Sequence, residues 1–231
     1  MTDPRLYIFP HAGGSPSFYV PFSKAFSPGI KRIAVQYPGT QNGQPTVPEI
    51  VSLAERLYRV LAKAPEGPVA FFGHSMGALV AFEVARRFES AGNPIQTLFV
   101  SACAAPGRMK SEYFHELSDD ELLKFLVALS GTDPRVLENK ELVDMALPGL
   151  RGYYNAIAGY TCPDEATVSC PIYAFVATDD PLATNESMAG WSSHTTADFA
   201  LRTFQGNHFY LAEHIPDLVA DVETKFGGQR V

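Results

Sequence analysis

The sequence predicts an α/β protein in which one domain, residues 1–231, forms a mostly parallel β-sheet with helices on both faces. Short, continuous apolar runs such as Val69–Phe72 and Ile172–Ala177 are typical of strands that are buried on both faces. Helical patterns separate most of these runs, as expected for successive strand–helix–strand units. A length of 231 residues with 46% apolar and 19% charged residues suits one globular domain with a sizeable core.

Six strands are expected along the chain. They are predicted from short runs rich in aliphatic and aromatic residues, and most end at a turn that contains Gly, Pro or Asp. The predicted strands cover Leu6–Pro10, Arg32–Tyr37, Val69–Phe72, Thr97–Cys103, Ile172–Ala177 and Ala200–Phe204.

Helices are expected in the connections between these strands. Thr46 and Glu49 have the spacing of a capping box, which predicts a helix that opens at Thr46. Apolar periodicity and a following glycine predict a second helix over about Met76–Ser90. A C-terminal helix is predicted over about Phe209–Lys225.

The segment from about Gly107 to Tyr160 breaks the alternation of strands and helices. It has no strand pattern and is longer than the ~10–15 residues that a crossover between parallel strands needs. Ser118 and Glu121 have capping-box spacing, and more helix is expected over about 135–145 and 147–160. Two interpretations remain open: ordinary helices packed on the core, or a lid over a ligand cleft.

Charge and cysteine content exclude several classes of function. A net charge of −7 and a pI near 5.3 argue against nucleic acid or an anionic membrane as the main partner. No apolar run approaches the ~20 residues of a membrane span, and the first residues lack a secretory signal pattern. Cys103, Cys162 and Cys170 have no metal-ligand spacing, so we expect reduced thiols in a cytoplasmic protein.

Gly73-His74-Ser75-Met76-Gly77 matches the pattern G-x-S-x-G. The match alone is weak, because it arises by chance in roughly one chain in ten of this composition. Its position directly after a buried strand and before a helix is the one that a nucleophile elbow requires. There the backbone N–H groups and dipole of the helix favour a developing negative charge. The motif therefore predicts Ser75 as a nucleophile.

A serine hydroxyl is a weak nucleophile that needs a base, and the base needs an orienting acid. Behind such an elbow, the acid and then the histidine follow at the carboxyl ends of later strands. His208, after the last predicted strand, is the best base among the six histidines. Asp179 and Asp180 both follow the fifth strand, and Pro181 favours Asp180 by holding its backbone extended. The alternative for His208 is a structural role in its loop. The alternative for either aspartate is to cap a helix.

Two backbone N–H groups are expected to form an oxyanion hole. One belongs to Met76, the residue after the predicted nucleophile, and the other to Ala12 in the loop His11-Ala12-Gly13-Gly14. A plain strand-to-helix turn is the alternative for that loop. Because all these elements meet at the carboxyl edge of one sheet, the sequence predicts a serine hydrolase with an α/β-hydrolase fold and no metal or organic cofactor.

Several motifs resemble those of the type II thioesterases, α/β-hydrolases that serve polyketide and nonribosomal peptide synthases. The motifs are His11-Ala12-Gly13-Gly14, Tyr37-Pro38-Gly39, Gly73-His74-Ser75-Met76-Gly77 and Gly206-Asn207-His208-Phe209. The resemblance covers essentially the whole chain and is closer still to the mycobacterial members, which work beside the polyketide synthases of phthiocerol dimycocerosate and phenolic glycolipid waxes. Two departures are Thr40-Gln41-Asn42, where many relatives have an arginine, and Ala177, where many have a glycine.

The resemblance implies the same catalytic residues: Ser75, Asp180 and His208, with the Ala12 and Met76 amides as oxyanion donors. It also implies hydrolysis of acyl thioesters on the phosphopantetheine arm of an acyl carrier protein, without a cofactor, either in editing or in product release. A small-ester carboxylesterase and a non-catalytic binding scaffold remain alternative functions.

The predicted lid has two features that bear on substrate binding. Arg108, Lys110 and Arg151 would form either a basic docking patch for an acidic carrier protein or ordinary solvated charge. An apolar surface for the acyl chain is expected from Leu122, Phe125, Leu126, Leu129, Met145, Leu147, Tyr153 and Tyr154.

Overall fold

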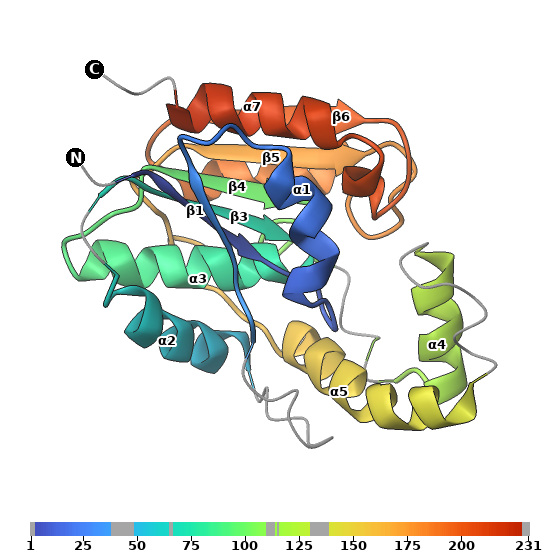
Figure 1. The fold of residues 1–231 in the computed structure, drawn as a ribbon. Coiled ribbons are helices and arrows are strands. Elements are labelled where there is room, and N and C mark those ends of the chain that lie inside the picture. Colours follow the sequence, from blue (N-terminus) through green and yellow to red (C-terminus); the bar gives the residue numbers. More distant parts are fainter. Residues whose placement is uncertain are drawn as a thin grey trace.

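The computed structural model describes residues 3–37, 49–64, 67–109, 114, 116–129 and 139–227 of the chain. Its centre is a six-stranded parallel sheet with the strand order β2-β1-β3-β4-β5-β6 (Figure 1). The predicted parallel α/β architecture is thereby confirmed. The strands are β1 (Arg5–Phe9), β2 (Lys31–Ala34), β3 (Val69–His74), β4 (Thr97–Ser101), β5 (Ile172–Ala177) and β6 (Phe199–Phe204).

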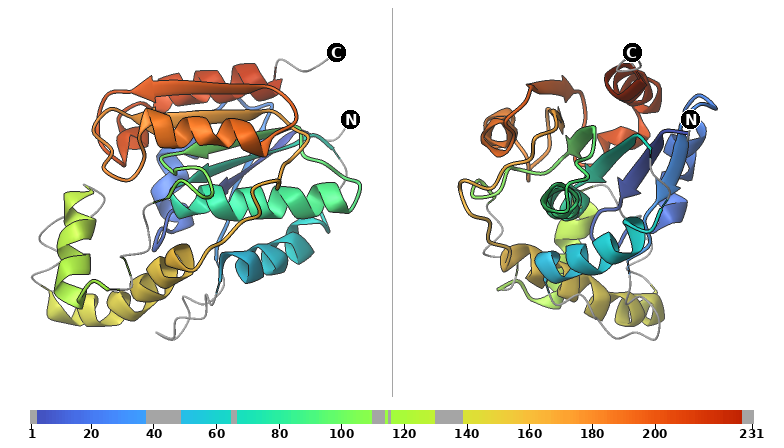
Figure 2. Two further views of the ribbon diagram at one scale, coloured as in Figure 1. Left: turned by 180° about the vertical axis from the view of Figure 1, so that it is seen from behind. Right: turned by 90° about the vertical axis from the view of Figure 1, so that its left-hand side faces the viewer.

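Helices cover both faces of the sheet (Figure 1 and Figure 2). On one face lie α2 (Ile50–Leu61) and α3 (Met76–Ser90), and on the other lie α1 (Val20–Lys24) and α7 (Ile215–Gly227). The helices α4 (Asp119–Ala128) and α5 (Lys140–Ala158) stand beyond the carboxyl ends of the strands, and α6 (Asn185–Ala189) packs on β5 and β6. Short 3₁₀ helices cover Pro16–Tyr19 (η1), Gly190–His194 (η4) and Tyr210–Ala212 (η5). Among the helices of the described residues, none combines the length and the apolar character that crossing a membrane requires.

Both faces of the sheet are buried, because strand side chains alternate between two apolar cores. On β1, Tyr7 and Phe9 join the core that contains α2 and α3, whereas Leu6 and Ile8 join the core that contains α7. Helix α3 is buried along most of its length, since it lies between the sheet and α2. The carboxyl edge of the sheet is therefore supported by packed helices on both sides.

Two predicted helix starts are wrong. Helix α2 begins at Ile50 with Glu49 as its extended N-cap residue (φ −160°, ψ 149°), so Glu49 is not the third residue of a capping box. Thr46 lies outside the described residues. The buried apolar stripe from Ile50 onward, rather than the cap spacing, determines this start.

The C-terminal helix begins at Ile215 rather than at Phe209. Pro216 explains this start, because proline lacks an N–H and is tolerated in the first turn of a helix but not further inside. The residues just before it form the separate 3₁₀ helix η5.

The predicted interruption between residues 145 and 147 is absent, because α5 runs unbroken through this region with Pro148 inside it. The ribbon of α5 bends along its length in Figure 1, as expected for a helix with an internal proline. The capping box at Ser118 is confirmed: the Glu121 N–H donates to Ser118 Oγ, and the Ser118 N–H donates to Glu121 Oε2 at 2.8 Å.

Helix α3 approaches the end of β1 so closely that Gly77 has no room for a side chain. A Cβ at this position would lie 2.0 Å from the carbonyl oxygen of Phe9 and 2.7 Å from that of Pro10. At Gly73, a Cβ would lie 2.3 Å from the Gly77 carbonyl oxygen. The outer glycines of the G-x-S-x-G motif thus let the start of α3 pack against the segment that leads into the loop after β1.

We expect Gly77→Ala to lower the free energy of unfolding by about 3 kcal/mol, because the atoms in the way are backbone and cannot rotate aside. Gly149→Ala in α5 is the matched control, since a Cβ there meets no heavy atom within 4 Å. It should be neutral or stabilise by up to about 1 kcal/mol, as alanine favours helix more than glycine does. Urea unfolding of the two variants measures the difference, and equal stabilities would contradict this account of the packing.

Candidate active site

Ser75 occupies a strained turn between β3 and α3. Its backbone has φ 55° and ψ −128°, a conformation that residues with side chains rarely adopt. The Ser75 N–H donates to the carbonyl oxygen of Ser101, at the end of β4, at 2.8 Å. This bond and the two flanking glycines hold a partly buried hydroxyl at the N-terminus of α3, as in a nucleophile elbow.

His208 lies between Ser75 and Asp180. Its Nε2 is 3.0 Å from Ser75 Oγ, and its Nδ1 is 2.9 Å from Asp180 Oδ2. Because an ionised carboxylate only accepts hydrogen bonds, Nδ1 carries the ring proton and Nε2 accepts from the serine hydroxyl. Both His208 and Asp180 are buried, and Asp180 Oδ1 accepts from the Leu182 N–H at 2.9 Å. The carboxylate is thereby held in the orientation that contacts the imidazole.

Asp179, the other acid considered from the sequence, has different neighbours. Its side chain is exposed, and Oδ2 accepts from the Thr178 hydroxyl at 3.0 Å. Its N–H donates to the Gly206 carbonyl oxygen at 2.9 Å. The geometry therefore favours Asp180 over Asp179 as the partner of His208.

A buried chain of hydrogen bonds joins the elbow to the loop that carries His208. His74 Nδ1 lies 2.9 Å from Ser101 Oγ, which in turn lies 2.8 Å from the Tyr210 hydroxyl. All three side chains are fully buried. Ser101 thus contacts the residue before Ser75 through its side chain and Ser75 itself through its carbonyl. Because Tyr210 follows His208 by two residues, this chain supports the contact between His208 and Ser75.

The loop after β1 holds Ala12, one of the two predicted oxyanion donors. The Gly14 N–H donates to the His11 carbonyl oxygen at 2.9 Å, and Gly13 has φ 74°, a left-handed conformation that favours glycine. Met76, the other predicted donor, is buried in the first turn of α3. The close packing of α3 on the end of β1 brings these two backbone segments beside each other.

Two histidines beside His208 are kept neutral by burial. Burial lowers the pKa of His11 from its ordinary value of 6.5 to about 3, and the neighbouring His208 adds to the effect. Burial also lowers the pKa of His74 well below its ordinary value, with smaller contributions from His208 and His11. At neutral pH neither ring adds a positive charge beside His208. Within the described part of the chain, no group of three or more His, Cys, Asp or Glu residues is arranged to hold a metal ion.

A narrow cavity of about 50 Å³ lies beside Ser75. Its walls come from the elbow, from the segments after β4 and β5, from Phe114 and from α5. The lining is mostly apolar and includes Leu79, Met109, Phe114, Tyr154 and Ile157. A concave apolar site next to a polar reacting group suits an acyl substrate.

The side chains predicted to bind an acyl chain have different environments. Tyr154 lines the cavity, and the ring of Tyr153 lies 6.2 Å from that of Tyr37. Met145 is 66% exposed. Leu122 belongs to the core that contains α2 and α3, and Phe125, Leu126 and Leu147 pack against that core. Leu129 is also buried.

The sequence analysis missed Phe114 and Ile157 as cavity residues. Ile157 could have been found, because it lies three positions after Tyr154 and therefore on the same face of α5. Phe114 carries no such signal, since it precedes α4 and belongs to no periodic pattern.

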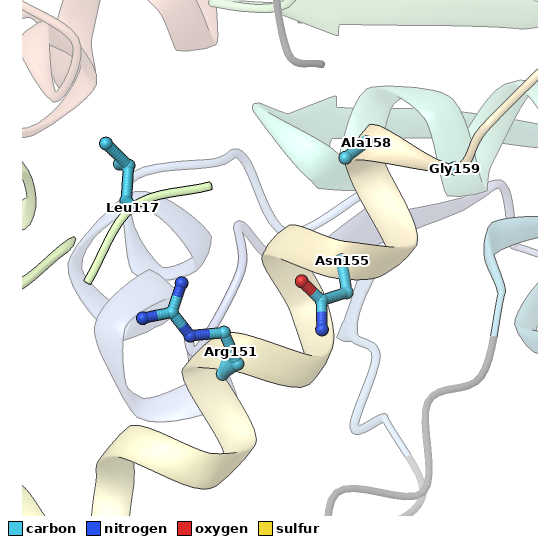
Figure 3. Close-up of a pocket in the computed structure, with 5 residues that line it drawn as sticks. All are labelled: Leu117, Arg151, Asn155, Ala158 and Gly159. Carbon is cyan, nitrogen blue, oxygen red and sulfur yellow. The ribbon is translucent and has the colours of Figure 1, made fainter. Parts of the chain in front are cut away.

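A second pocket, of about 460 Å³, lies beside α5 and is lined by Leu117, Arg151, Asn155, Ala158 and Gly159 (Figure 3). The Arg151 guanidinium donates to Asp119 Oδ1 at 2.6 Å and to the Phe114 carbonyl oxygen at 3.3 Å. Arg151 is thus already paired with an acid, whereas Arg108 is exposed and Lys110 lies outside the described residues. The ion pair weakens the case for Arg151 as part of a basic docking patch.

Comparison with known proteins agrees with the fold. The family model of the thioesterase domain matches residues 4–226. The chain is 49% identical over 227 residues to the thioesterase TesA of Mycobacterium marinum, covering 96% of this chain and 91% of the relative. It is 49% identical over 228 residues to TesA of Mycobacterium leprae, covering 97% and 87%. The solved structure of the type II thioesterase BorB from the borrelidin biosynthetic cluster has a TM-score of 0.88 and 44% identity, covering 97% of this chain and 93% of that one.

The fold and the site define an α/β-hydrolase, which confirms the predicted fold class. The chain belongs to the thioesterase family, and its similarity to mycobacterial thioesterases and to a type II thioesterase is confirmed. The protein is therefore an enzyme that hydrolyses thioesters.

The neutral state of His11 has a consequence for stability that can be measured. Below pH 6.5 the unfolded chain takes up a proton on His11, while the folded chain stays neutral to about pH 3, so acid favours unfolding. We expect His11→Gln to reduce the slope of unfolding free energy against pH between about pH 6.5 and pH 5, by up to about 1.4 kcal/mol per pH unit. Urea unfolding at several pH values tests this, and an unchanged slope would show that His11 titrates alike in both states.

Proposed function

We propose that this enzyme hydrolyses acyl thioesters on the phosphopantetheine arm of an acyl carrier protein, in support of polyketide-type or nonribosomal peptide synthesis. The observation that carries the proposal is the hydrogen-bond chain Ser75–His208–Asp180 at the edge of an apolar cavity. Similarity to a type II thioesterase from a biosynthetic gene cluster supports a carrier-bound substrate.

In the first half of the reaction, Ser75 Oγ attacks the thioester carbonyl carbon while His208 Nε2 takes the hydroxyl proton. Asp180 holds the Nδ1 proton and stabilises the imidazolium that forms. The oxyanion of the tetrahedral intermediate accepts hydrogen bonds from the backbone N–H groups of Met76 and Ala12. The C–S bond then breaks, and the pantetheine sulfur leaves as a thiol with the proton from His208.

The second half regenerates the enzyme. A water molecule gives a proton to His208 Nε2 and attacks the acyl–Ser75 ester. The second tetrahedral intermediate collapses, and His208 returns the proton to Ser75 Oγ. The products are a carboxylic acid and a carrier protein with a free thiol.

The proposal includes the lid interpretation of segment 107–160. Helix α5 rests on the loop after β1, since a Cβ at Gly13 would lie 2.5 Å from Leu150 Cδ2. A cavity of about 50 Å³ has room for only a few water-sized groups. A longer acyl chain would therefore need Phe114 and α5 to move away from the elbow.

A cytoplasmic location is also part of the proposal. Cys103, Cys162 and Cys170 are free thiols. Unpaired cysteines suit a reducing compartment.

We predict that Ser75→Ala or His208→Ala lowers kcat about 10³-fold or more, because each removes a group that acts directly on the reacting atoms. Asp180→Asn should also lower kcat strongly by favouring the wrong imidazole tautomer. Asp179→Asn, the matched control, should leave kcat within a few-fold of the wild type. Near-wild-type turnover by purified Ser75→Ala or His208→Ala would defeat the mechanism.

Cavity size should decide which acyl chains are accepted. Ile157→Ala removes part of the cavity wall and should raise kcat/KM for chains longer by two or three carbons, by about fourfold per buried methylene (~0.8 kcal/mol). Met145→Ala is the control, because this side chain belongs to the same helix but is exposed. Hydrolysis rates across a series of acyl thioesters measure the preference. An identical profile for Ile157→Ala and the wild type would count against this cavity as the acyl site.

Substrate class is tested by comparing an acyl group on a purified carrier protein with the matched oxygen ester. The proposal predicts a higher kcat/KM for the carrier-bound thioester and labelling of the wild type, but not of Ser75→Ala, by a fluorophosphonate probe. Preference for the oxygen ester would favour a carboxylesterase. Absence of labelling and of turnover would favour a binding scaffold.

A further inference from the structure

The peptide unit between Pro10 and His11 is held at both ends by tyrosine hydroxyls. The Tyr37 hydroxyl donates to the Pro10 carbonyl oxygen at 2.7 Å, and the His11 N–H donates to the Tyr19 hydroxyl oxygen at 3.2 Å. In a trans peptide the C=O and N–H groups point in opposite directions, so the two tyrosine hydroxyls bind the peptide unit at opposite edges. Tyr19 and Tyr37 are both buried, and they reach this peptide from different elements of the chain, η1 and the segment after β2.

The Tyr19 hydroxyl also orients the side chain of His11. Its oxygen lies 2.9 Å from His11 Nδ1 while accepting the backbone N–H of the same residue. Burial lowers the pKa of His11 to about 3, so the ring is neutral at pH 7 and its Nδ1 either accepts the Tyr19 hydroxyl proton or donates its own to the hydroxyl oxygen.

The next peptide unit contains the Ala12 N–H. Its carbonyl, that of His11, accepts from the Gly14 N–H at 2.9 Å, so the Ala12 N–H points the opposite way, out of that turn. The orientation of this unit depends on the backbone torsions at His11, and these are fixed by the clamped peptide before it and the bonded ring beside it. The two tyrosine hydroxyls therefore act on the peptide unit directly before the one that contains the Ala12 N–H.

Packing connects the same ring to the catalytic histidine loop. The His11 ring makes edge contacts with Phe18 and Phe209, each at 4.9 Å between centroids, and Phe209 directly follows His208. Gly14 leaves space for the ring, because a Cβ there would lie 2.7 Å from His11 Cε1. A shift of His11 would disturb both the loop after β1 and the residue next to His208.

We propose that Tyr19 and Tyr37 are positioning residues for the oxyanion hole, which clamp the Pro10–His11 peptide and so aim the Ala12 N–H at the tetrahedral intermediate. The inference rests on the proposed hydrolytic mechanism, in which Ala12 is an oxyanion donor. The tyrosines act through Ala12 and not on the substrate, so their loss affects stabilisation of the intermediate more than binding of the ground state.

The test uses Tyr19→Phe and Tyr37→Phe, which remove one hydroxyl each and keep the rings. Each should lower kcat about tenfold, less than the 10²–10³-fold loss expected when a donor is removed altogether, with KM within about twofold of the wild type. An alkyl trifluoromethyl ketone, which forms a tetrahedral oxyanion adduct with a catalytic serine, should bind about tenfold more weakly. The planar carboxylic acid product should bind as it does to the wild type.

Tyr58→Phe is the control for loss of a phenol hydroxyl, because Tyr58 lies on α2 and packs against Phe88 in the core on that side of the sheet. It should change none of these values. Folded Tyr19→Phe and Tyr37→Phe variants with wild-type affinity for the trifluoromethyl ketone would overturn the inference. If a tyrosine variant does not fold, His11→Phe keeps the ring contacts but removes Nδ1. It should weaken ketone binding at least threefold, and wild-type affinity would overturn the inference equally.

Ser75→Ala separates this inference from the proposed function. Turnover retained by Ser75→Ala would show that the proposed mechanism is wrong. An inactive Ser75→Ala together with wild-type ketone affinity in the tyrosine variants would leave the mechanism standing and reject only the positioning role.

Discussion

The contact between His208 Nε2 and Ser75 Oγ is the interaction on which the rest of the site depends. The two residues are 133 positions apart in the chain, yet their side chains lie 3.0 Å apart. In the proposed mechanism this contact supplies the base that activates the serine hydroxyl, and the roles proposed for the acid and for the loop after β1 both require it. The parallel sheet makes the contact possible, because it brings the carboxyl ends of β3, β5 and β6 to one edge.

Contacts at this edge hold the strained backbone of Ser75, and burial keeps the histidines near His208 uncharged. The unfavourable backbone conformation of Ser75 persists because Ser101 binds its N–H and because Gly73 and Gly77 permit close packing around it. Because His11 and His74 are neutral, neither adds a positive charge near His208 that would interact with Asp180. In the proposed mechanism, the positive charge that forms on His208 is compensated by the buried carboxylate of Asp180.

The sheet and the elements that carry the site could be predicted from the sequence, because apolar runs, glycine spacing and chain order are local or one-dimensional signals. The choice between Asp179 and Asp180 could not be settled in this way. The two are neighbours in one loop, and their directions depend on backbone contacts such as that of Asp180 with the Leu182 N–H. The starts of α2 and α7 were misplaced, because packing and a proline outweighed capping and periodicity.

Contacts between distant segments were even harder to predict from the sequence. Phe114 reaches the cavity from an irregular stretch, and Tyr19 and Tyr37 reach the Pro10–His11 peptide from separate elements. Nothing in the spacing of these aromatic residues distinguishes them from ordinary core residues. They become visible only when the tertiary fold brings them to the carboxyl edge.

The most direct test of the account is a single-turnover reaction with an acyl carrier protein, stopped within milliseconds and analysed by mass spectrometry of the peptide that contains Ser75. The account predicts a transient acyl group on the oxygen of Ser75 that forms before the free acid is released. Release of the acid at the full rate with no acyl group on this serine at any time would contradict it.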